Sequence, residues 1–390
     1  MQIVSVLIPL GLPGPYDYAV PPDMDVQVGD FVRVPLGPRR VNGVVWQAPR
    51  TLGKGDIEPK KIKSIVEHLD VPALSEQLRE FVDWVAAYVM SPPGSVLRQV
   101  MRVPTAFEPA KPLLAYRASA QRPDKMTPAR TRVFEALAEL PQGVGLTSPD
   151  LAREAKVSAS VIKGLFEGGF LQSYNLPGHK AFAQPEPDHL TRSFSGDQKI
   201  VTQDLSAAVG ERSFTTHLLD GVTGSGKTEV YFEAIAQALR ENRQALILLP
   251  EISLTTQFLE RFETRFGCAP ALWHSGLGPS ERRRTWREIS EGRVQVLVGA
   301  RSALFLPWQD LGVIIVDEEH DGGFKQEDGV IYNARDMSVV RARLASCPVI
   351  LSSATPSLES YVNGREGRYE IHKLASRHGG ASMPKMQLVD

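Results

Sequence analysis

Short, wholly apolar runs recur in the second half of the chain and alternate with segments of helical periodicity. These runs lie near residues 216–219, 245–249, 294–298, 312–316 and 348–352. Strands that are apolar on both faces are typical of a parallel sheet that helices cover on each side. We therefore predict an α/β lobe over residues 194–390.

The first 105 residues have a different pattern, in which strand-like segments are separated by Pro and Gly. The segments are 3–8, 30–35 and 41–46, and their punctuation by turn residues predicts a β-rich domain over residues 1–105. One helix is expected at residues 75–90, because its apolar positions recur at spacings of three and four.

Residues 113–176 have the pattern of three short helices and a hairpin. Ser148 is expected to cap the second helix, and residues 159–167 form the third. Three such helices with a hairpin make a winged helix, which is a relative of the helix-turn-helix. Because Lys163 is the only basic residue of the third helix, a DNA contact and a spacer or docking role both stay open.

Composition narrows the class of protein without identifying a partner. The chain has 390 residues, 42% of them hydrophobic, and a net charge of −1, which neither supports nor excludes nucleic acid. Cys268 and Cys347 lie far apart and outside any C-x-x-C pattern, so we predict no zinc site and no disulfide in this chain. That cysteine usage fits a reducing cytoplasm. No apolar run reaches 18 residues, so no membrane span is predicted.

The strongest chemical signal is a phosphate-loop motif of the form G-x-x-x-x-G-K-[ST]. Its eight residues are Gly221, Val222, Thr223, Gly224, Ser225, Gly226, Lys227 and Thr228. A strand before the motif and a helix after it would aim backbone N–H groups at a triphosphate. We predict that all eight bind ATP, that Lys227 reaches the β- and γ-phosphates, and that Thr228 supplies a hydroxyl to Mg²⁺. This context disfavours a glycine-rich turn without nucleotide.

Polar segments follow two later strands and add the kinds of residues that motor ATPases place beside a phosphate loop. Asp317 follows an apolar run and can hold Mg²⁺ through water, and Glu318 can orient or deprotonate the attacking water. Ser353, Ala354 and Thr355 follow the next run and could sense the γ-phosphate and relay its loss. The alternatives are a solvated acidic turn and a plain Ser/Thr turn. The order of the motifs favours a nucleic-acid-driven ATPase.

Three weaker features have competing interpretations. Gln198, upstream of the loop, could pair with adenine, although a surface glutamine is the default. Aromatic and basic residues after the acidic segment suit stacking on bases and holding phosphates, but the aromatic rings could instead pack inside the loop. The residues concerned are Phe324, Lys325, Tyr332 and Arg335. Four arginines within residues 282–287 are expected to form a solvated face.

Taken in order, the motifs resemble helicase motifs I to III of the PriA (primosomal protein N′) family of bacterial replication-restart helicases. The segments concerned are 222–231, 249–255, 274–277, 299–307, 317–321 and 351–356. Residues 16–18, 33–37 and 84–97 are similar to the family's N-terminal DNA-binding domain. The resemblance covers nearly the whole chain. It implies an α/β multidomain fold: a β-rich DNA-binding domain, a winged helix and a RecA-like P-loop lobe with a parallel sheet.

The same resemblance implies a function. The family is an ATP-dependent 3′-to-5′ DNA helicase that uses ATP and Mg²⁺, recognises forks and D-loops, and initiates primosome assembly. Its partners would be branched DNA with a free 3′ end, single-stranded DNA-binding protein and other primosome proteins. The pocket for the 3′ end would comprise Tyr16, Asp17, Gly37 and Lys63. Asp17 would accept a hydrogen bond from the 3′-OH, and Tyr16, which stands where Phe is expected, would stack on the last base.

The family pattern extends beyond this sequence into a second motor lobe, an arginine finger and a cysteine-rich insertion, so zinc is implied only for that part. We therefore expect a truncated form that binds DNA, unwinds nothing and hydrolyses ATP poorly, because the ATP cleft closes between two lobes. A non-catalytic scaffold that recognises forks is the alternative function. A restriction-type DNA translocase shares motifs I to III but gives no reason for the N-terminal resemblance.

Overall fold

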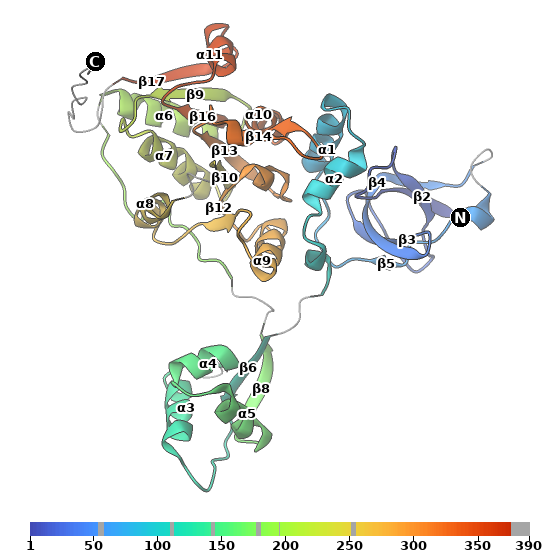
Figure 1. Cartoon of the computed structure of the whole chain (residues 1–390), viewed down its shortest axis with the longest axis vertical. Helices are drawn as coiled ribbons and strands as arrows, with labels where there is room; N and C mark the ends of the chain where they lie inside the picture. Colours follow the sequence, from blue (N-terminus) through green and yellow to red (C-terminus); the bar gives the residue numbers. More distant parts are fainter. Residues whose placement is uncertain are drawn as a thin grey trace, which may run out of the picture. The chain divides into compact units, whose positions relative to one another are not determined.

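The computed structural model describes residues 1–53, 58–109, 113–141, 145–176, 181–194, 196–250 and 255–375. The chain forms two compact units (Figure 1). The first combines Met1–Glu108 with Phe182–Asp390, and the second, Pro109–Ala181, is inserted between these two parts. Among the described residues, no helix combines the length and the apolar character that crossing a membrane requires.

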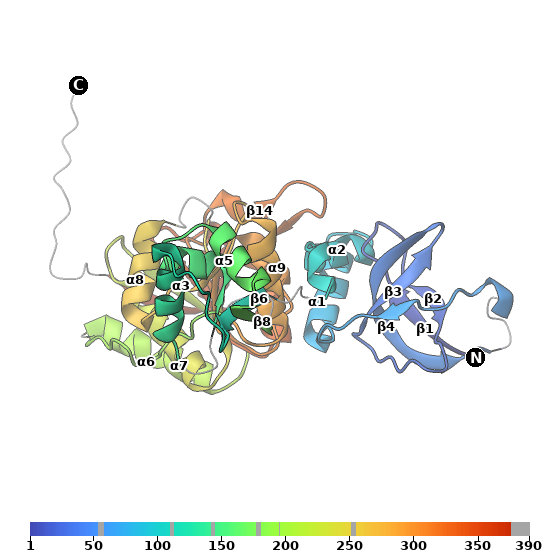
Figure 2. The ribbon, with the colours of Figure 1, turned by 90° about the horizontal axis from the view of Figure 1, so that it is seen from below.

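The first unit begins with a five-stranded antiparallel sheet of order β2-β1-β4-β3-β5. Its strands are β1 (Gln2–Leu7), β2 (Tyr16–Ala19), β3 (Phe31–Leu36), β4 (Arg39–Thr51) and β5 (Glu67–His68). The strands curl around a small core that includes Val4, Val6, Val32 and Val45 (Figure 2). The three predicted strands correspond to β1, β3 and β4. The short strands β2 and β5 carry too few apolar residues to stand out in the sequence.

Two helices, α1 (Glu76–Tyr88) and α2 (Pro93–Val100), follow this sheet, with a 3₁₀ turn η2 (Pro104–Phe107) after them. The Ser75 hydroxyl caps α1 by accepting a hydrogen bond from the Leu78 amide at 3.4 Å. The apolar face of α1 packs onto the later lobe: the ring centroids of Phe81 and Phe305 are 5.3 Å apart. One continuous hydrophobic core therefore runs from the N-terminal sheet into the lobe.

A seven-stranded parallel sheet forms the lobe, with order β11-β12-β10-β13-β16-β9-β17. Its strands are β9 (Thr216–Gly221), β10 (Gln244–Leu248), β11 (Ala271–Trp273), β12 (Val296–Gly299), β13 (Leu311–Asp317), β16 (Val349–Ser353) and β17 (Glu370–Leu374). The five apolar runs correspond to five of these strands, which confirms the predicted parallel sheet. The sequence pattern did not predict β11 and β17, because β11 is three residues long and β17 carries charged residues.

Helices cover both faces of this sheet. The helices are α6 (Gly196–Gly210), α7 (Lys227–Arg240), α8 (Thr256–Phe266), α9 (Pro279–Ser290), α10 (Ala334–Leu344) and α11 (Leu358–Arg365). Buried residues of α6, α7 and α8 share one core with one face of the sheet, and those of α9, α10 and α1 share the other. The lobe is therefore an α/β layer structure of the RecA-like type, as predicted.

The inserted unit pairs helices with a three-stranded sheet of order β7-β6-β8. Its elements are β6 (Leu113–Ala118), α3 (Pro128–Ala138), β7 (Leu146–Thr147), α4 (Ser148–Glu154), α5 (Ala159–Glu167) and β8 (Leu171–Leu176). The expected hairpin is absent among its described residues, because β8 pairs with β6, which the sequence pattern missed. The N-cap of α4 is Thr147 rather than Ser148: its side chain accepts a hydrogen bond from the Asp150 amide.

Candidate nucleotide site and DNA-end pocket

A cavity of about 570 Å³ opens at the carboxyl ends of β9 and β13, the edge where open α/β sheets bind ligands. The phosphate-loop residues Thr223 to Thr228 line it together with Gln198, Asp317 and Glu318. Its volume lies in the usual range for small-molecule sites. The fold thus brings the phosphate loop together with Gln198 and with the Asp317-Glu318 pair, which begins 89 residues after Thr228 in the sequence.

The phosphate loop is held open by two glycines in the left-handed region, Gly224 at φ 80° and Gly226 at φ 85°. A side chain at Gly226 would also collide with Gln198, since a Cβ there would lie 2.6 Å from its Nε2. The helix α7 begins directly after this loop, at Lys227. Its first amide groups and helix dipole are therefore directed toward the cavity.

Two polar groups of the loop suit a bound phosphate. The Lys227 ammonium is buried and donates to the Gly221 carbonyl at 2.7 Å. The Ser225 hydroxyl is buried and has no hydrogen-bond partner among the described residues, and such a group normally finds one. A cation, an unpartnered hydroxyl and a helix N-terminus together fit a polyphosphate.

Asp317 is oriented by two hydroxyl groups. Its Oδ2 accepts from the Tyr231 phenol at 2.8 Å, and its Oδ1 accepts from Ser352 Oγ at 2.8 Å. Burial, followed by the charge of Asp317, raises the pKa of Tyr231 well above its ordinary value, so the phenol stays a neutral donor. With the Thr228 hydroxyl, Asp317 offers the oxygen ligands that Mg²⁺ prefers.

Glu318 sits beside Asp317 in a left-handed conformation with φ 52°, which is uncommon for a residue other than Gly, Asn or Asp. Burial, followed by the negative charge of Asp317, raises the pKa of its carboxyl group. A carboxylate with a raised pKa is a stronger base than an ordinary glutamate. Glu318 is thus suited to take a proton from a water molecule at the cavity.

A hydrogen-bond network joins the acidic segment to residues 353–360. His320 Nδ1 and Ser353 Oγ lie 2.8 Å apart, and the Thr355 amide donates to the same Ser353 oxygen at 3.0 Å. Glu319, fully buried, accepts from the Ser357 amide at 2.7 Å. Ala354 lies in the turn between them. The residues directly after Asp317 and Glu318 are thus hydrogen-bonded to this segment, and its role in coupling ATP to movement stays a prediction.

Gln198 lies at the cavity but contacts protein: its Nε2 donates to the Ser225 carbonyl at 2.8 Å. An adenine contact stays a prediction. Sequence reasoning missed Arg192 and Phe194, which also line the cavity. They belong to a Pro-rich segment that carries no helix or strand periodicity, so nothing in the pattern distinguished them.

The four residues of the predicted DNA-end pocket lie on neighbouring segments of the N-terminal sheet. Lys63 Nζ donates to the Gly37 carbonyl at 3.4 Å, and Gly37 adopts φ 60°. Tyr16 and Asp17 begin the edge strand β2, and the ring of Tyr16 is exposed. Tyr18, the next residue on that strand, donates from its phenol to the Pro35 carbonyl at 3.1 Å, which ties β2 to the end of β3.

Asp17 is already fixed by two partners that the sequence did not indicate. Its Oδ1 accepts from Ser5 Oγ at 2.7 Å, and its Oδ2 accepts from Arg50 Nη2 at 2.8 Å. A carboxylate has about four lone-pair positions, so each oxygen can accept a further hydrogen bond. The two hydrogen bonds orient Asp17 without using up its acceptor capacity.

Three of the residues expected to contact DNA have protein partners instead. The rings of Phe324 and Tyr332 are 1% and 4% exposed, and Tyr332 packs edge-on against Phe305. They form part of the core, as the alternative interpretation held, and are not available for stacking in this conformation. Arg335 donates to Ser357 at 2.7 Å and to Asp336 at 2.8 Å, so its guanidinium serves the protein. Lys325 is exposed, and its DNA contact stays a prediction.

The arginines of α9 do not form a solvated face. Arg283 Nη2 donates to the Glu108 carbonyl at 2.8 Å, and Arg287 Nη1 donates to the Asp70 carbonyl at 2.6 Å. Between them the Trp286 indole, fully buried, donates to the Val100 carbonyl at 2.9 Å. This face of α9 is an internal interface. Sequence periodicity indicated this face of the helix. It did not indicate the carbonyl groups that accept from it, which belong to residues 175 to 217 positions earlier in the sequence.

Parts of two predicted segments, residues 251–254 and 376–390, lie outside the described residues. The first belongs to the motif expected at 249–255. The second contains the end of the sequence and of the lobe predicted over residues 194–390.

Comparison with known proteins adds independent information. Residues 5–102 match the family described as the 3′DNA-binding domain (3′BD) of PriA, and residues 199–363 match the DEAD/DEAH box helicase family. Replication restart protein PriA of Rickettsia conorii is 31% identical over 393 residues, which cover 100% of this chain and 48% of that protein. PriA of Chlamydia pneumoniae is 34% identical over 394 residues, which cover 96% of this chain and 51% of that protein. The chain spans about half the length of the curated relatives that it matches.

Among solved structures, RecG bound to a three-way DNA junction has a TM-score of 0.37 and 21% sequence identity. The match covers 50% of this chain and 25% of that one. A likeness this low has no bearing on function.

Proposed function

We infer that this chain binds branched DNA with a free 3′ end and binds MgATP. It matches replication restart proteins PriA over its whole length, and it carries a PriA 3′DNA-binding domain and a DEAD/DEAH box helicase domain. For the whole protein we propose ATP-dependent 3′-to-5′ unwinding at stalled or abandoned forks and the start of primosome assembly. Single-stranded DNA-binding protein and other primosome proteins are the proposed partners, in the cytoplasm. The names of the relatives support this proposal.

The observation that carries the nucleotide proposal is the cavity that the phosphate loop shares with Asp317 and Glu318. Lys227 and the amides at the start of α7 would hold the phosphates. Thr228 and Asp317 would hold Mg²⁺, which supplies charge neutralisation at the phosphates when it is bound. Glu318 would orient a water molecule and take its proton. The network through His320 and Ser353 would transmit the loss of the γ-phosphate.

A binding measurement with two lysine variants tests this site. We expect the chain to bind a fluorescent ATP analogue in the presence of Mg²⁺, and Lys227→Ala to weaken binding by roughly 10- to 100-fold, because a hydrogen bond to a charged group contributes about 1.5–3 kcal/mol. The matched control is Lys199→Ala, an exposed lysine of α6. Equal affinities of the three proteins would contradict the assignment of this cavity.

The DNA-end proposal rests on the exposed Tyr16 ring beside the oriented Asp17 carboxylate. We expect the chain to bind a synthetic fork with a 3′-OH end more tightly than the same fork with a 3′-phosphate, because the phosphate cannot donate to Asp17 and repels it. Asp17→Asn should reduce this preference by roughly tenfold, whereas Asp23→Asn, an exposed control, should keep it.

The two measurements also separate the alternative function. Fork binding that depends on the 3′ end, with no detectable nucleotide binding, would identify a recognition scaffold rather than part of a motor. Fork binding that ignores both the 3′ end and Asp17 would leave no role for the predicted pocket.

A further inference from the structure

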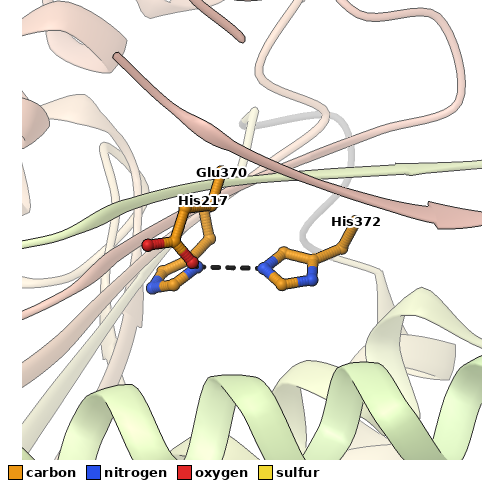
Figure 3. Close-up of side chains that lie close together, drawn as sticks. All are labelled: His217, Glu370 and His372. Carbon is orange, nitrogen blue, oxygen red and sulfur yellow. Dashed lines mark hydrogen bonds and ion pairs between the residues drawn. The ribbon is translucent and has the colours of Figure 1, made fainter. Parts of the chain in front are cut away.

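A second cluster of chemically active side chains lies on the sheet away from the ATP cavity (Figure 3). It contains His217 of β9 and Glu370 and His372 of β17. Nδ1 of His217 and Nε2 of His372 are 3.0 Å apart, and Oε2 of Glu370 is 3.4 Å from the same His217 nitrogen. One ligand atom from each of the three residues thus lies within 4.8 Å of the others.

The sheet register explains why the three side chains meet. Glu370 pairs with His217 across the parallel strands, and His372 pairs with Leu219. Because side chains alternate along a strand, residues 370 and 372 point to one face, the face that His217 also uses. In Figure 3 a ring nitrogen of His217 points toward a ring nitrogen of His372. Regular strand geometry is sufficient to hold the cluster.

The outer nitrogens of both histidines have partners of their own. His217 Nε2 lies 2.9 Å from Thr215 Oγ1, and His372 Nδ1 lies 3.8 Å from a carboxylate oxygen of Asp204 on α6. Metal-binding histidines almost always have such a partner on the nitrogen that does not bind the metal, because it fixes the tautomer and the ring orientation. In this cluster the inner nitrogens converge, the outer nitrogen of His217 has a hydrogen-bond partner in Thr215, and the outer nitrogen of His372 faces the Asp204 carboxylate.

We propose that His217, Glu370 and His372 form a binding site for one divalent transition-metal ion of the Zn²⁺ type. Two imidazoles and one carboxylate are a ligand set that zinc uses in proteins, with a fourth position for water or another ligand. The histidines are 1% and 9% exposed, whereas the Glu370 side chain is 62% exposed, so the ion would enter from the Glu370 side. This site is separate from the Mg²⁺ position proposed at Asp317 and Thr228, and it differs from the absence of zinc that the two cysteines predicted, because its ligands are histidine and glutamate.

The ion would connect the strand that leads into the phosphate loop with its neighbour at the edge of the sheet. β9 leads into the phosphate loop, and β17 is the outermost strand of the sheet on that side, paired only with β9 among the described strands. Further along the same register, Leu374 pairs with Gly221, the first residue of the loop motif. A metal bridge from His217 to Glu370 and His372 would hold this edge strand against the strand that positions the loop.

The test is Zn²⁺ binding by the full chain after treatment with a chelator, measured by calorimetry and by metal analysis after dialysis. We expect one tightly bound equivalent, and a rise in the melting temperature when Zn²⁺ is added, because an ion that binds only the folded state stabilises it. Co²⁺ should give the visible absorption of a four-coordinate nitrogen and oxygen site. The double variant E370Q/H372Q should lose the bound equivalent, the stabilisation and the Co²⁺ signal.

Two controls make the result specific. E366Q/H189Q removes one carboxylate and one imidazole elsewhere on the described surface and should keep the bound ion. Thr215→Val removes only the hydroxyl behind His217 and should weaken Zn²⁺ binding by roughly tenfold. The proposal is overturned if the wild-type chain binds no Zn²⁺, or if both double variants bind it equally.

Discussion

At the scale of single residues, neighbouring side chains fix the orientation of the Asp317 carboxylate. The carboxylate is 9% exposed and accepts hydrogen bonds from Tyr231 and Ser352. Each donor comes from a different element, α7 and β16, so the orientation of Asp317 depends on the packing of the whole sheet edge. Such preorganised hydrogen bonds are the usual means by which a protein fixes a metal-binding carboxylate.

Replacing Tyr231 by Phe should destabilise the fold and loosen this carboxylate. The change removes one hydrogen bond to a buried charge, which costs about 1.5–3 kcal/mol in the free energy of unfolding, while the apolar ring keeps its place in the core. Urea unfolding followed by circular dichroism measures it. Tyr361→Phe, at an exposed position on α11, should change the free energy of unfolding by less than about 0.5 kcal/mol. Equal effects of both variants would contradict the role given to Tyr231.

At the scale of elements, α9 is the helix whose role differs most from its sequence pattern. Its arginine-rich face suggests a surface, yet Arg283 and Arg287 donate to backbone carbonyls of the N-terminal region. The carbonyls belong to segments without regular strand pairing, where backbone acceptors would otherwise need water. The helix therefore joins the N-terminal region to the lobe through its charged side chains as well as through Trp286.

Trp286→Phe should weaken this junction. The variant loses the indole hydrogen bond to the Val100 carbonyl and leaves space at a fully buried position, for a combined cost of about 2–3 kcal/mol in the free energy of unfolding. Chemical denaturation gives the value. Trp84→Phe is the matched control, because Trp84 is 37% exposed and stacks on Tyr88 at the surface. A cost no larger than that of the control would show that α9 does not hold the two regions together.

Elements with strong periodicity could be predicted from the sequence, and those defined by partners could not. The buried strand at 312–316 and the helix at 75–90 carry enough apolar residues to be recognised alone. In contrast, β17 is an edge strand that carries Glu370 and Lys373, and β6 forms its sheet with β7 and β8, two strands that come later in the sequence. The phosphate loop and Asp317 were found because their motifs are local. Tyr231, Ser5 and Arg50 were missed because their roles depend on contacts across the fold.

At the scale of the whole molecule, the inserted unit leaves and rejoins the first unit beside one helix. Arg283 of α9 donates to the Glu108 carbonyl, just before the insertion. The next residue, Arg284, lies 3.8 Å above the ring of Phe182, just after it. The two residues that flank the insertion are therefore held by consecutive arginines of α9, within the first unit.

Removing residues 109–181 should consequently leave the first unit folded. A Gly/Ser linker of about six residues, which reaches up to roughly 20 Å, should replace the insertion with little change in the unfolding midpoint or in MgATP affinity. Calorimetry on the shortened chain measures both. Aggregation or loss of nucleotide binding would show that the insertion supports the first unit. Fork affinity of the same protein reports whether the winged-helix-like unit contributes to DNA binding, which its sequence left open.

The hydrophobic core shared by the N-terminal sheet and the lobe has a mechanical consequence. A strand end held at Tyr16 and Asp17 would be attached to the same block of protein that carries the phosphate loop, because Phe81 and Trp286 pack the two parts into one interior. The N-terminal sheet would then not move relative to the phosphate loop. A 3′ end bound at the proposed pocket would therefore keep a fixed position relative to the phosphate loop.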